Sequence, residues 1–339
     1  MSSRVTDGKK LHEVQQQKAC CAPAASRSTV PELQPAGPRA LNLQPASEAG
    51  ESGPMIALPG GTFLMGTDYP DGFPQDGEGP IRPVTLSPFE IDTFPVTNAA
   101  FAKFIAATGY RTEAEMFGWS FVFWSHISKE RFGQIVADTV AAAPWWCKVP
   151  GAYWQAPEGP SSDVRDRPLH PVVHVSWNDA GAYASWASKS LPTEAQWEYA
   201  ARGGLVQKLY PWGNELTPGG KHRCNIWQGD FPKIDTAEDG FAGSCPVDSF
   251  PPNGFGLYSV TGNVWEWCVD WFHPSYHVGK LLNDPIGPPG GQAKVMKGGS
   301  FLCHASYCNR YRVAARTSNT PDSSTSNTGF RCVRNLTPQ

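Results

Sequence analysis

Two cysteines near the carboxyl end, Cys303 and Cys308, lie five residues apart in the run Lys297-Gly-Gly-Ser-Phe-Leu-Cys-His-Ala-Ser-Tyr-Cys-Asn-Arg-Tyr-Arg312. The same run carries a hydroxyl at Ser300 and a phenol at Tyr307, next to glycines that leave the backbone free to turn. Two thiols at this spacing can close a small disulfide, hold a metal, exchange disulfides or lie inert in the core, because free cysteine is among the most buried residue types. This run is therefore the first candidate for chemistry.

A structural zinc site is a poor fit to this pair, because such sites take four ligands, usually as two close pairs. The chain has no second Cys-x-x-Cys or His-x-His pair. Cu(I), in contrast, is the first-row ion that thiolates select, and a site with two thiolates leaves room for a third sulfur. The residue types alone leave the inert and disulfide readings open beside copper.

Further motifs extend the pattern from about residue 55 to residue 334. They are Leu58-Pro-Gly-Gly-Thr-Phe-Leu-Met-Gly66, His170-Pro-Val-Val-His-Val-Ser-Trp-Asn-Asp179, Leu191-Pro-Thr-Glu-Ala-Gln-Trp-Glu-Tyr199, Gly262-Asn-Val-Trp-Glu-Trp267 and Asn327-Thr-Gly-Phe-Arg-Cys332. Together with the paired cysteines, these motifs resemble the formylglycine-generating enzymes, the sulfatase-modifying oxidases. The middle motifs are shared by relatives that are not oxidases, whereas the paired cysteines are more specific.

The resemblance implies an oxidase that converts the cysteine of a Cys-x-Pro-x-Arg motif in an unfolded sulfatase polypeptide to Cα-formylglycine, using O₂ and a thiol reductant. Cys303 and Cys308 would hold Cu(I) as thiolates, and the substrate cysteine would join as a third sulfur. Ser300 and Tyr307 would hydrogen-bond an oxygen species or a bound water, although a turn hydroxyl and a core phenol explain them equally well. Trp265 would face the reactive centre.

Contacts with the substrate polypeptide are expected from two further residues. Asn327 resembles a position that contacts the substrate backbone, and Trp145 is the aromatic residue expected to line a peptide groove, because aromatics give contact area at low entropy cost. His304 is a minor candidate for tuning a thiolate. Four arginines are expected to tie loops to carboxylates rather than bind anions: Arg310, Arg312, Arg316 and Arg331.

Two sets of residues offer the oxygen ligands that Ca²⁺ prefers. The first set is Asn225, Ile226, Asp239 and Phe241, and the second is Ser259, Gly262, Val264 and Glu266. Residue types alone explain these positions as turn formers, but the resemblance implies two structural calcium sites. Because Ser259 stands where the family usually has Asn, the second site is expected to be weaker, occupied differently or completed by water.

Two other readings of the function stay open. An iron-dependent sulfoxide synthase on a related fold would use histidines from an additional helical domain, and its His-x₃-His-x-Glu pattern does not occur in this sequence. A non-catalytic lectin-like or sulfatase-binding module should lack one or both of Cys303 and Cys308.

Composition limits the fold and the partners. The chain has 339 residues, of which 40% are apolar, and its 34 Gly and 32 Pro indicate modest regular structure. We predict one irregular α+β domain, and the resemblance implies the C-type-lectin-like fold of the formylglycine-generating enzymes. The 28 basic and 31 acidic residues, with no basic run, argue against a nucleic-acid partner.

The cellular setting is predicted from three absences in the sequence. The polar start has no apolar h-region of a secretory signal, and no stretch approaches the roughly 18 apolar residues of a membrane helix. Nine scattered cysteines do not make a disulfide framework. The resemblance adds that Cys332 matches one half of a disulfide of secreted relatives, whereas its partner position reads Ala184 and another such position reads Val313. A cytoplasmic monomer without membrane contact is expected.

The elements that must position these residues begin after a tail rich in Ala, Pro, Ser and Gln. We predict a disordered tail over residues 1–53, with Cys20 and Cys21 as exposed thiols, and a single catalytic domain over residues 54–336. A strand, a Pro-Gly-Gly turn and a second strand are expected from Met55, with further strands over residues 84–86 and 89–92. Asn263 to Cys268 alternates as a strand does.

Three helices are predicted from their capping residues. One runs from Thr97 to Gly109, and one is capped by Ser176 and continues to Lys189. The third is capped by Thr193, with Gln196 three residues on, and closes at residues 203–204.

Two residue pairs near these helices are assigned structural roles. Glu198 and Arg202 lie one turn apart, which predicts a solvated ion pair. His170 and His174 lie on an extended segment, so structural histidines are favoured over a zinc pair.

Overall fold

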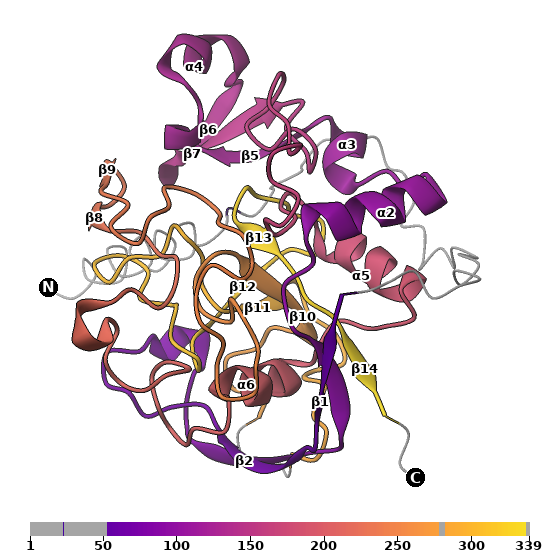
Figure 1. Cartoon of the computed structure of the whole chain (residues 1–339), viewed down its shortest axis with the longest axis vertical. Helices are drawn as coiled ribbons and strands as arrows, with labels where there is room; N and C mark the ends of the chain where they lie inside the picture. The colour runs from indigo at the N-terminus through magenta and orange to yellow at the C-terminus, as the bar shows by residue number, and fades with distance from the viewer. Residues whose placement is uncertain (1–22, 24–52, 278–281, 337–339) are drawn as a thin grey trace, which may run out of the picture.

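The computed structural model describes residue 23, residues 53–277 and residues 282–336. Apart from Pro23 and Gly53, the predicted tail of residues 1–53, with Cys20 and Cys21, lies outside the described residues. Short helices and small sheets are joined by long loops (Figure 1). The prediction of an α+β fold with modest regular structure is confirmed.

Five small sheets form in the described part of the chain, and the central one carries the strands nearest the thiol pair in sequence. Its strand order is β12-β11-β10-β13, with β10 at Trp265–Trp271, β11 at Lys294–Lys297, β12 at Arg316–Asn319 and β13 at Thr328–Gly329. The β10, β11 and β12 strands pair antiparallel, and β13 pairs parallel to β10. The residues that follow β11 and those that precede β13 therefore meet at one end of this sheet.

The other sheets surround the central one. Two have three strands: β1 (Met55–Leu58), β4 (Phe89–Asp92) and β14 (Val333–Asn335), and β5 (Trp119–Phe123), β7 (Ala143–Pro150) and β6 (Asp138–Val140). Two are ribbons: β2 (Gly61–Met65) with β3 (Arg82–Leu86), and β8 (Gly229–Asp230) with β9 (Ile234–Asp235). Figure 1 shows the β5–β7–β6 sheet at one end of the molecule and β2 at the opposite end.

The helices are short, and all except α4 begin at a residue whose side chain caps the helix. They are α2 (Asn98–Thr108), α3 (Glu113–Phe117), α4 (Lys129–Ile135), α5 (Trp177–Trp186) and α6 (Glu194–Arg202), with 3₁₀ turns at Pro74–Asp76, Trp124–His126 and Pro218–Gly220. The predicted caps Thr97, Ser176 and Thr193 each accept a hydrogen bond from the third residue of their helix. The 11 residues of α2 fall short of the roughly 20 that span a bilayer. Across the described ranges, none of the helices meets that requirement.

The end of α5 differs from its prediction, because the helix stops at Trp186 and not at Lys189. Ser188 adopts a φ of 54°, and the Lys189 N–H donates to the Ala184 carbonyl at 2.8 Å. The Lys189 ammonium forms a buried ion pair with Asp92 of β4. Because the chain turns at Ser188, the Lys189 ammonium lies next to the Asp92 carboxylate. A helix that continued to Lys189 would place this side chain elsewhere.

Glu198 and Arg202 form the predicted ion pair, but the prediction that it is solvated is wrong. Both side chains are buried, at 1% and 5% exposure. The Glu198 carboxylate accepts from the Gly66 N–H at 2.7 Å, from Arg202 at 2.7 Å and from Lys297 at 3.0 Å. Burial alone would raise the pKa of Glu198, but Lys297, Arg202 and the Gly66 N–H hold it at about 2. These contacts join α6 to Lys297 of β11 and to Gly66, which directly follows β2.

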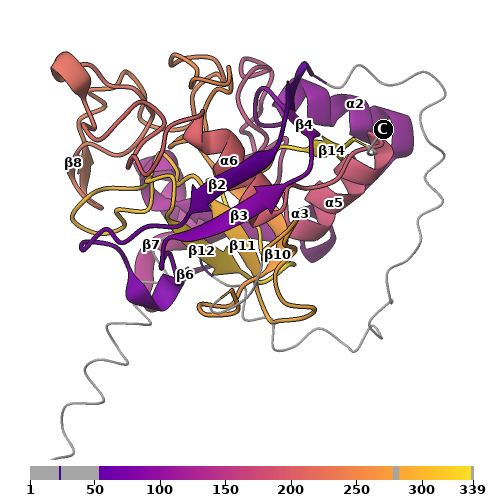
Figure 2. The same ribbon diagram turned by 90° about the horizontal axis from the view of Figure 1, so that it is seen from below.

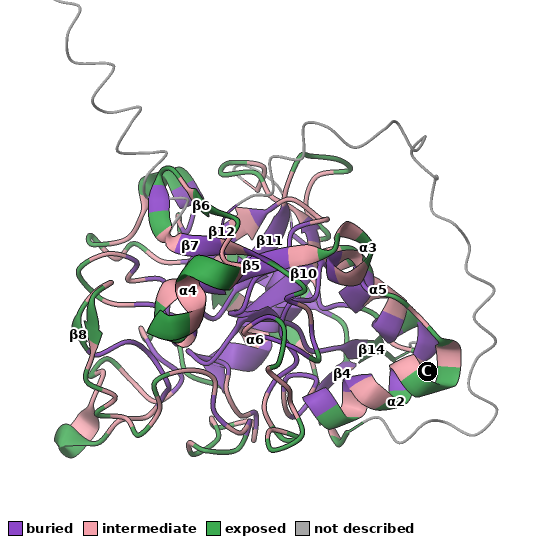
Figure 3. Ribbon diagram, turned by 90° about the horizontal axis from the view of Figure 1, so that it is seen from above, coloured by how far each residue is buried: buried purple, intermediate pink, exposed green. Residues whose placement is uncertain are grey.

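The core lies on both sides of α6, which contacts β10 and β11 of the central sheet and also β2 and β3 (Figure 2). Figure 3 shows α6 and the central strands as buried, in contrast to the largely exposed α4. On the far side of the central sheet, α2 and α5 pack through aromatic rings, with Phe101 stacked on Tyr183 at 5.9 Å. Pro23 is buried, and its carbonyl accepts from Asn319 at 3.2 Å and Ser323 at 2.9 Å.

Candidate active site

The two predicted thiols lie side by side, with Cys303 Sγ and Cys308 Sγ 3.0 Å apart. Both cysteines are buried, and neither is in a disulfide. The His304 carbonyl accepts from the N–H groups of Tyr307 at 3.1 Å and Cys308 at 2.9 Å, so the intervening residues make one tight turn. This turn folds Cys308 back onto Cys303 and explains how a spacing of five residues produces a pair.

The glycines before the pair are required by close packing. Gly299 has a φ of +74°, and a Cβ atom there would lie 2.9 Å from the Tyr311 Cα. Such an approach is closer than real side chains tolerate, so only glycine lets the chain turn from β11 towards Ser300.

A chain of hydrogen bonds connects three of the predicted site residues, all of them buried. The Asn327 side chain donates from Nδ2 to the Ser300 Oγ at 2.9 Å, and its Oδ1 accepts from Thr325 at 2.7 Å. The backbone N–H of Trp265 donates to the backbone carbonyl of Asn327 at 2.9 Å. Ser300, Asn327 and Trp265 are therefore held by one another, although they come from three separate segments.

Aromatic side chains form a wall beside Cys308, and we call Trp145, Trp227, Phe231 and Tyr307 the aromatic wall. Tyr307 stacks on Phe231 at 5.1 Å and meets Trp145 edge-on at 5.2 Å, while Phe231 meets Trp227 at 5.3 Å. The predicted residues Trp145 and Tyr307 are thus brought together.

Phe231 was not singled out from the sequence. It lies in a loop with no periodicity, between the two strands of the β8–β9 ribbon. Only its contacts reveal a role, because a lone Phe beside Pro232 gives no pattern that separates it from an ordinary turn residue.

Three indole groups of the site, those of Trp145, Trp227 and Trp265, carry unused donors. Their Nε1 atoms are buried, and within the described residues none of the three finds an acceptor. A buried donor without a partner costs about 1–3 kcal/mol, so a polar group that enters the site and accepts from it is stabilised. These tryptophans are therefore placed to receive a ligand.

Phe301 and Ser326 line a cavity of about 390 Å³. These two residues are the chain neighbours of Ser300 and Asn327, so the cavity lies close to the site residues. Its polar lining includes His126, which stacks on Phe301 at 5.3 Å, and the ion pair of Glu158 with Arg167 at 2.6 Å. A cavity of this volume accommodates several residues' worth of side chains, as a polypeptide ligand requires.

The donor atoms at the thiol pair match Cu(I) better than the other first-row ions. The described residues contain no group of three or more His, Cys, Asp or Glu side chains arranged to hold a metal, so this site offers two sulfurs alone. Two soft sulfurs suit a monovalent soft ion, whereas zinc prefers four ligands. Copper binding at Cys303 and Cys308 stays a prediction that the donor set fits.

The first predicted calcium set is assembled, with Asn225, Ile226, Asp239 and Phe241 in one place. The Asp239 carboxylate accepts from the N–H groups of Ile226 and Phe241, both at 3.0 Å. The Asn225 Oδ1 is buried and has no hydrogen-bond donor within the described residues. The Gln228 side chain donates from Nε2 to the Asp239 carboxylate at 2.9 Å and also to the Ile226 carbonyl. The oxygens of this set are of the kind that Ca²⁺ prefers, and calcium binding here stays a prediction.

The second predicted calcium set fits less well. The Glu266 carboxylate is buried and already neutralised by Arg331, with contacts at 2.7 and 2.8 Å, and it accepts from Trp197 Nε1 at 2.7 Å. The Ser259 hydroxyl donates to the Val247 carbonyl at 2.8 Å. Gly262 and Val264 contribute only backbone oxygens to this set, which stays a prediction.

The remaining polar residues near the site have structural partners. His304 is engaged with Ser306 through its Nδ1 at 2.7 Å. The buried His174 bonds Ser120 at 2.7 Å and the Pro157 carbonyl at 2.8 Å, and burial lowers its pKa to about 4. The prediction for the four arginines is confirmed by buried ion pairs: Arg310 with Asp76, Arg312 with Glu78, Arg316 with Glu194 and Arg331 with Glu266.

These features define a class of protein: an irregular α+β domain with a buried pair of neighbouring thiols, a hydrogen-bonded Ser–Asn pair and an aromatic wall. The family model described as "Sulfatase-modifying factor enzyme 1-like domain" matches residues 42–336. Since this match covers well over half of the 339 residues, the chain belongs to the sulfatase-modifying factor family.

Known relatives include proteins of different activity. A Thermomonospora curvata protein named formylglycine-generating enzyme is 65% identical over 283 residues, which cover 82% of this chain and 92% of that protein. A mouse protein named inactive C-alpha-formylglycine-generating enzyme 2 is 51% identical over 282 residues, which cover 82% of this chain and 85% of that protein. The site, and not the identity alone, must therefore carry the argument about activity.

Among solved structures, PvdO from Pseudomonas aeruginosa shares the fold. Its TM-score is 0.60 at 26% sequence identity, and the match covers 83% of this chain and 94% of that one. The predicted fold of the formylglycine-generating enzymes is confirmed.

Proposed function

We propose that this chain is a formylglycine-generating oxidase, which converts the cysteine of a Cys-x-Pro-x-Arg motif in an unfolded sulfatase polypeptide to Cα-formylglycine. The observation that carries the proposal is the buried pair of thiols of Cys303 and Cys308, whose sulfur atoms lie 3.0 Å apart. The relatives named formylglycine-generating enzyme support it. The second candidate function is a non-catalytic, sulfatase-binding role, because one mouse relative is named inactive.

The overall reaction balances with O₂ and a two-electron thiol reductant. The substrate R–CH₂–SH loses its C–S bond and one C–H bond and becomes R–CHO. Sulfur leaves as H₂S, one oxygen atom enters the aldehyde, and the other leaves as water with the two hydrogens that the reductant supplies. Copper held by Cys303 and Cys308 would supply the soft site that binds the substrate thiolate and activates O₂.

The hydroxyl of Ser300 is set up to donate a hydrogen bond. Its Oγ accepts from the Leu302 N–H at 3.3 Å and from Asn327 Nδ2 at 2.9 Å, which uses both lone pairs. The hydroxyl proton is then left to point at a developing negative charge, where a preorganised donor in a dry site lowers the barrier. Asn327 is the positioning residue that fixes this direction.

The surroundings of the thiols exclude water. Trp265 and Ser300 are each 0% exposed, and the aromatic wall packs beside Cys308. Exclusion of water strengthens every hydrogen bond to the reacting atoms and prevents their side reactions with solvent. The unused indole N–H groups of Trp145 and Trp265 would each donate a hydrogen bond to a substrate carbonyl.

The proposal is tested by mass spectrometry of a Leu-Cys-Thr-Pro-Ser-Arg peptide incubated with the protein, Cu(I), a thiol and O₂. The expected result is loss of sulfur and gain of an aldehyde, which an added hydrazide traps. A copper-loaded protein that binds the peptide and leaves it unchanged would establish the non-catalytic role instead.

A further inference from the structure

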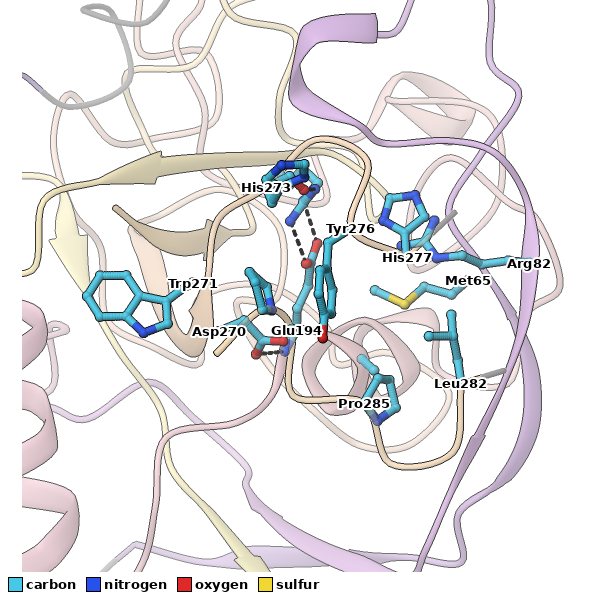
Figure 4. A pocket seen from close by; sticks show the side chains of 14 residues that line it. Met65, Arg82, Glu194, Asp270, Trp271, His273, Tyr276, His277, Leu282 and Pro285 are labelled. Carbon is cyan, nitrogen blue, oxygen red and sulfur yellow. Dashed lines mark hydrogen bonds and ion pairs between the residues drawn. The ribbon is translucent and has the colours of Figure 1, made fainter. Parts of the chain in front are cut away.

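A second polar cavity lies apart from the residues of the candidate active site. Its volume is about 50 Å³, and it is enclosed by the start of β3, the start of α6, the end of β10 and the loop that follows β10 (Figure 4). One lining residue, His273, is exposed, so the cavity reaches solvent. None of its lining residues is among the predicted catalytic, metal-binding or substrate-binding positions.

Arg82 is the cation of this cavity that lacks a counter-charge. Within the described residues its guanidinium forms no ion pair, and it donates a hydrogen bond from Nη1 to the Pro80 carbonyl at 3.0 Å. Its Nε is buried and has no acceptor. Burial lowers the pKa of Arg82, and the charges of Glu198 and Glu194, which form no ion pair with it, only partly offset this effect.

The neighbouring carboxylates are already shared by other cations. Glu194 contacts Arg316 at 2.7 Å and Lys297 at 3.7 Å, and Glu198 contacts Arg202 at 2.7 Å and Lys297 at 3.0 Å. Positive charge therefore exceeds negative charge in this network.

The third acid, Asp270, is also committed, because its Oδ2 accepts from the Glu194 N–H at 2.7 Å. Burial and the neighbouring Glu194 charge raise the pKa of Asp270 to about 7, so this acid is a weak counter-charge for Arg82, and an anion from outside would complete the site.

The cavity also has an apolar wall. Figure 4 shows Arg82, His277, Met65 and Leu282 on one side, with Asp270 and Glu194 on the other. His277 donates from Nε2 to the Gly79 carbonyl at 3.1 Å, which holds its ring in place beside Arg82. Met65 and Leu282 belong to the same buried cluster. A ligand here meets a cation at one end and hydrocarbon at the other.

We propose that this cavity binds a small organic carboxylate with a short apolar tail, of the size of acetate or propionate, with Arg82 as its anchor. The planar guanidinium donates through paired N–H groups to carboxylate oxygens, and the tail lies against Met65 and Leu282. The limited volume excludes larger acids, and an inorganic oxyanion would leave the apolar wall without a partner. This inference is independent of the proposed oxidase activity.

Binding is measured on the full chain by calorimetric titration with sodium propionate and sodium acetate, at an ionic strength held constant with sodium chloride. We expect saturable binding of both, with propionate the tighter ligand. Arg82→Gln should weaken binding at least tenfold. Arg334→Gln is the matched control, because Arg334 is a half-exposed partner of Glu90, and it should bind propionate as the unaltered chain does.

A second readout covers the case in which Arg82→Gln fails to fold. Saturation-transfer NMR on the unaltered chain should show magnetisation passing from the protein to the propionate methyl group. Arg82→Lys keeps the positive charge but loses the paired N–H donors of the guanidinium, so it should bind propionate more weakly. Absence of saturable carboxylate binding overturns the inference. So does equal binding by Arg82→Gln, and so does a preference for phosphate or sulfate over both carboxylates.

Discussion

At the scale of single residues, the proposed chemistry depends on two sulfur atoms that the fold brings together. Cys303 and Cys308 are buried among apolar side chains, and their thiols face each other at 3.0 Å. The buried Cys147 differs from this pair, because burial raises its pKa to about 11, which keeps that thiol protonated and inert.

Replacing either paired cysteine by serine should abolish peptide conversion and leave the fold intact. Serine is close in size to cysteine, so we expect little change in the thermal unfolding midpoint. A hydroxyl is a poor ligand for a soft ion, so turnover measured by mass spectrometry should fall to background in Cys303→Ser and in Cys308→Ser. Cys147→Ser is the matched control for a buried thiol and should keep full turnover. Activity in either paired variant contradicts the site assignment.

Asn327 should act on the reaction through Ser300. Asn327→Ala removes the donor that orients the Ser300 hydroxyl, and Ser300→Ala removes the hydroxyl itself. Each variant should lose about a hundredfold in kcat, the order of effect of one preorganised donor. The double variant should be little slower than Ser300→Ala, because groups that act as a unit are not additive.

Ser323→Ala serves as the control for this pair, since its buried hydroxyl donates to the Pro23 carbonyl at 2.9 Å and has no bond to Ser300. It should affect stability and leave kcat unchanged. Strictly additive losses in the Ser300 and Asn327 variants would show that Asn327 has a separate role.

At the scale of elements, the starts of helices followed from the sequence more faithfully than their ends or their burial. Thr97, Ser176 and Thr193 were predictable because a cap is a contact between residues three apart. The end of α5 depends on Asp92, which is 97 residues from Lys189. The burial of Glu198 likewise depends on Gly66 and Lys297, and a spacing of one helical turn does not reveal such distant partners.

The thiol pair itself shows the same contrast between local and distant causes. Its closeness arises from one turn between Cys303 and Cys308, so the sequence sufficed to predict a pair. The hydrogen bond between Ser300 and Asn327 and the stacking of Phe231 on Tyr307 join residues from separate loops. The resemblance to a family indicated Asn327, whereas nothing in the sequence indicated Phe231.

The buried network of α6 predicts a large effect of Glu198→Gln. This change leaves Arg202 and Lys297 without a carboxylate inside the protein, which should lower the free energy of unfolding by about 3–5 kcal/mol. Because the folded pKa of Glu198 is depressed to about 2, its stabilising contribution is present above pH 4.5 and is lost as pH falls from 4.5 towards 2. The loss of stability in that range should therefore be smaller in Glu198→Gln than in the unaltered chain.

Urea unfolding between pH 2 and pH 7 measures both effects. Glu90→Gln is the matched control, because its ion pair with Arg334 is 27% and 46% exposed and should contribute less than about 1 kcal/mol. Equal destabilisation by the two variants would contradict the account of a buried network.

At the scale of the whole molecule, long loops must be held by contacts other than regular hydrogen bonding between strands. The 34 Gly and 32 Pro of the chain and its short sheets leave much of the fold in loops. Four buried arginines, each paired with a carboxylate from another segment, provide one means. A bound cation at Asn225 and Asp239 would provide another, because it would join two loop segments at one point.

Removal of calcium should therefore destabilise the molecule if the first set binds the ion. We expect a chelator to lower the thermal unfolding midpoint and added Ca²⁺ to restore it, since a ligand that binds only the folded state stabilises it by mass action. Asp239→Asn removes the one carboxylate of the set and should make the midpoint insensitive to both additions. Asp248→Asn, at an exposed aspartate of a nearby loop, should respond to calcium as the unaltered chain does. A midpoint that ignores chelator in the unaltered chain would show that the orphaned Asn225 oxygen has another partner, and that the loops rely on the arginine pairs alone.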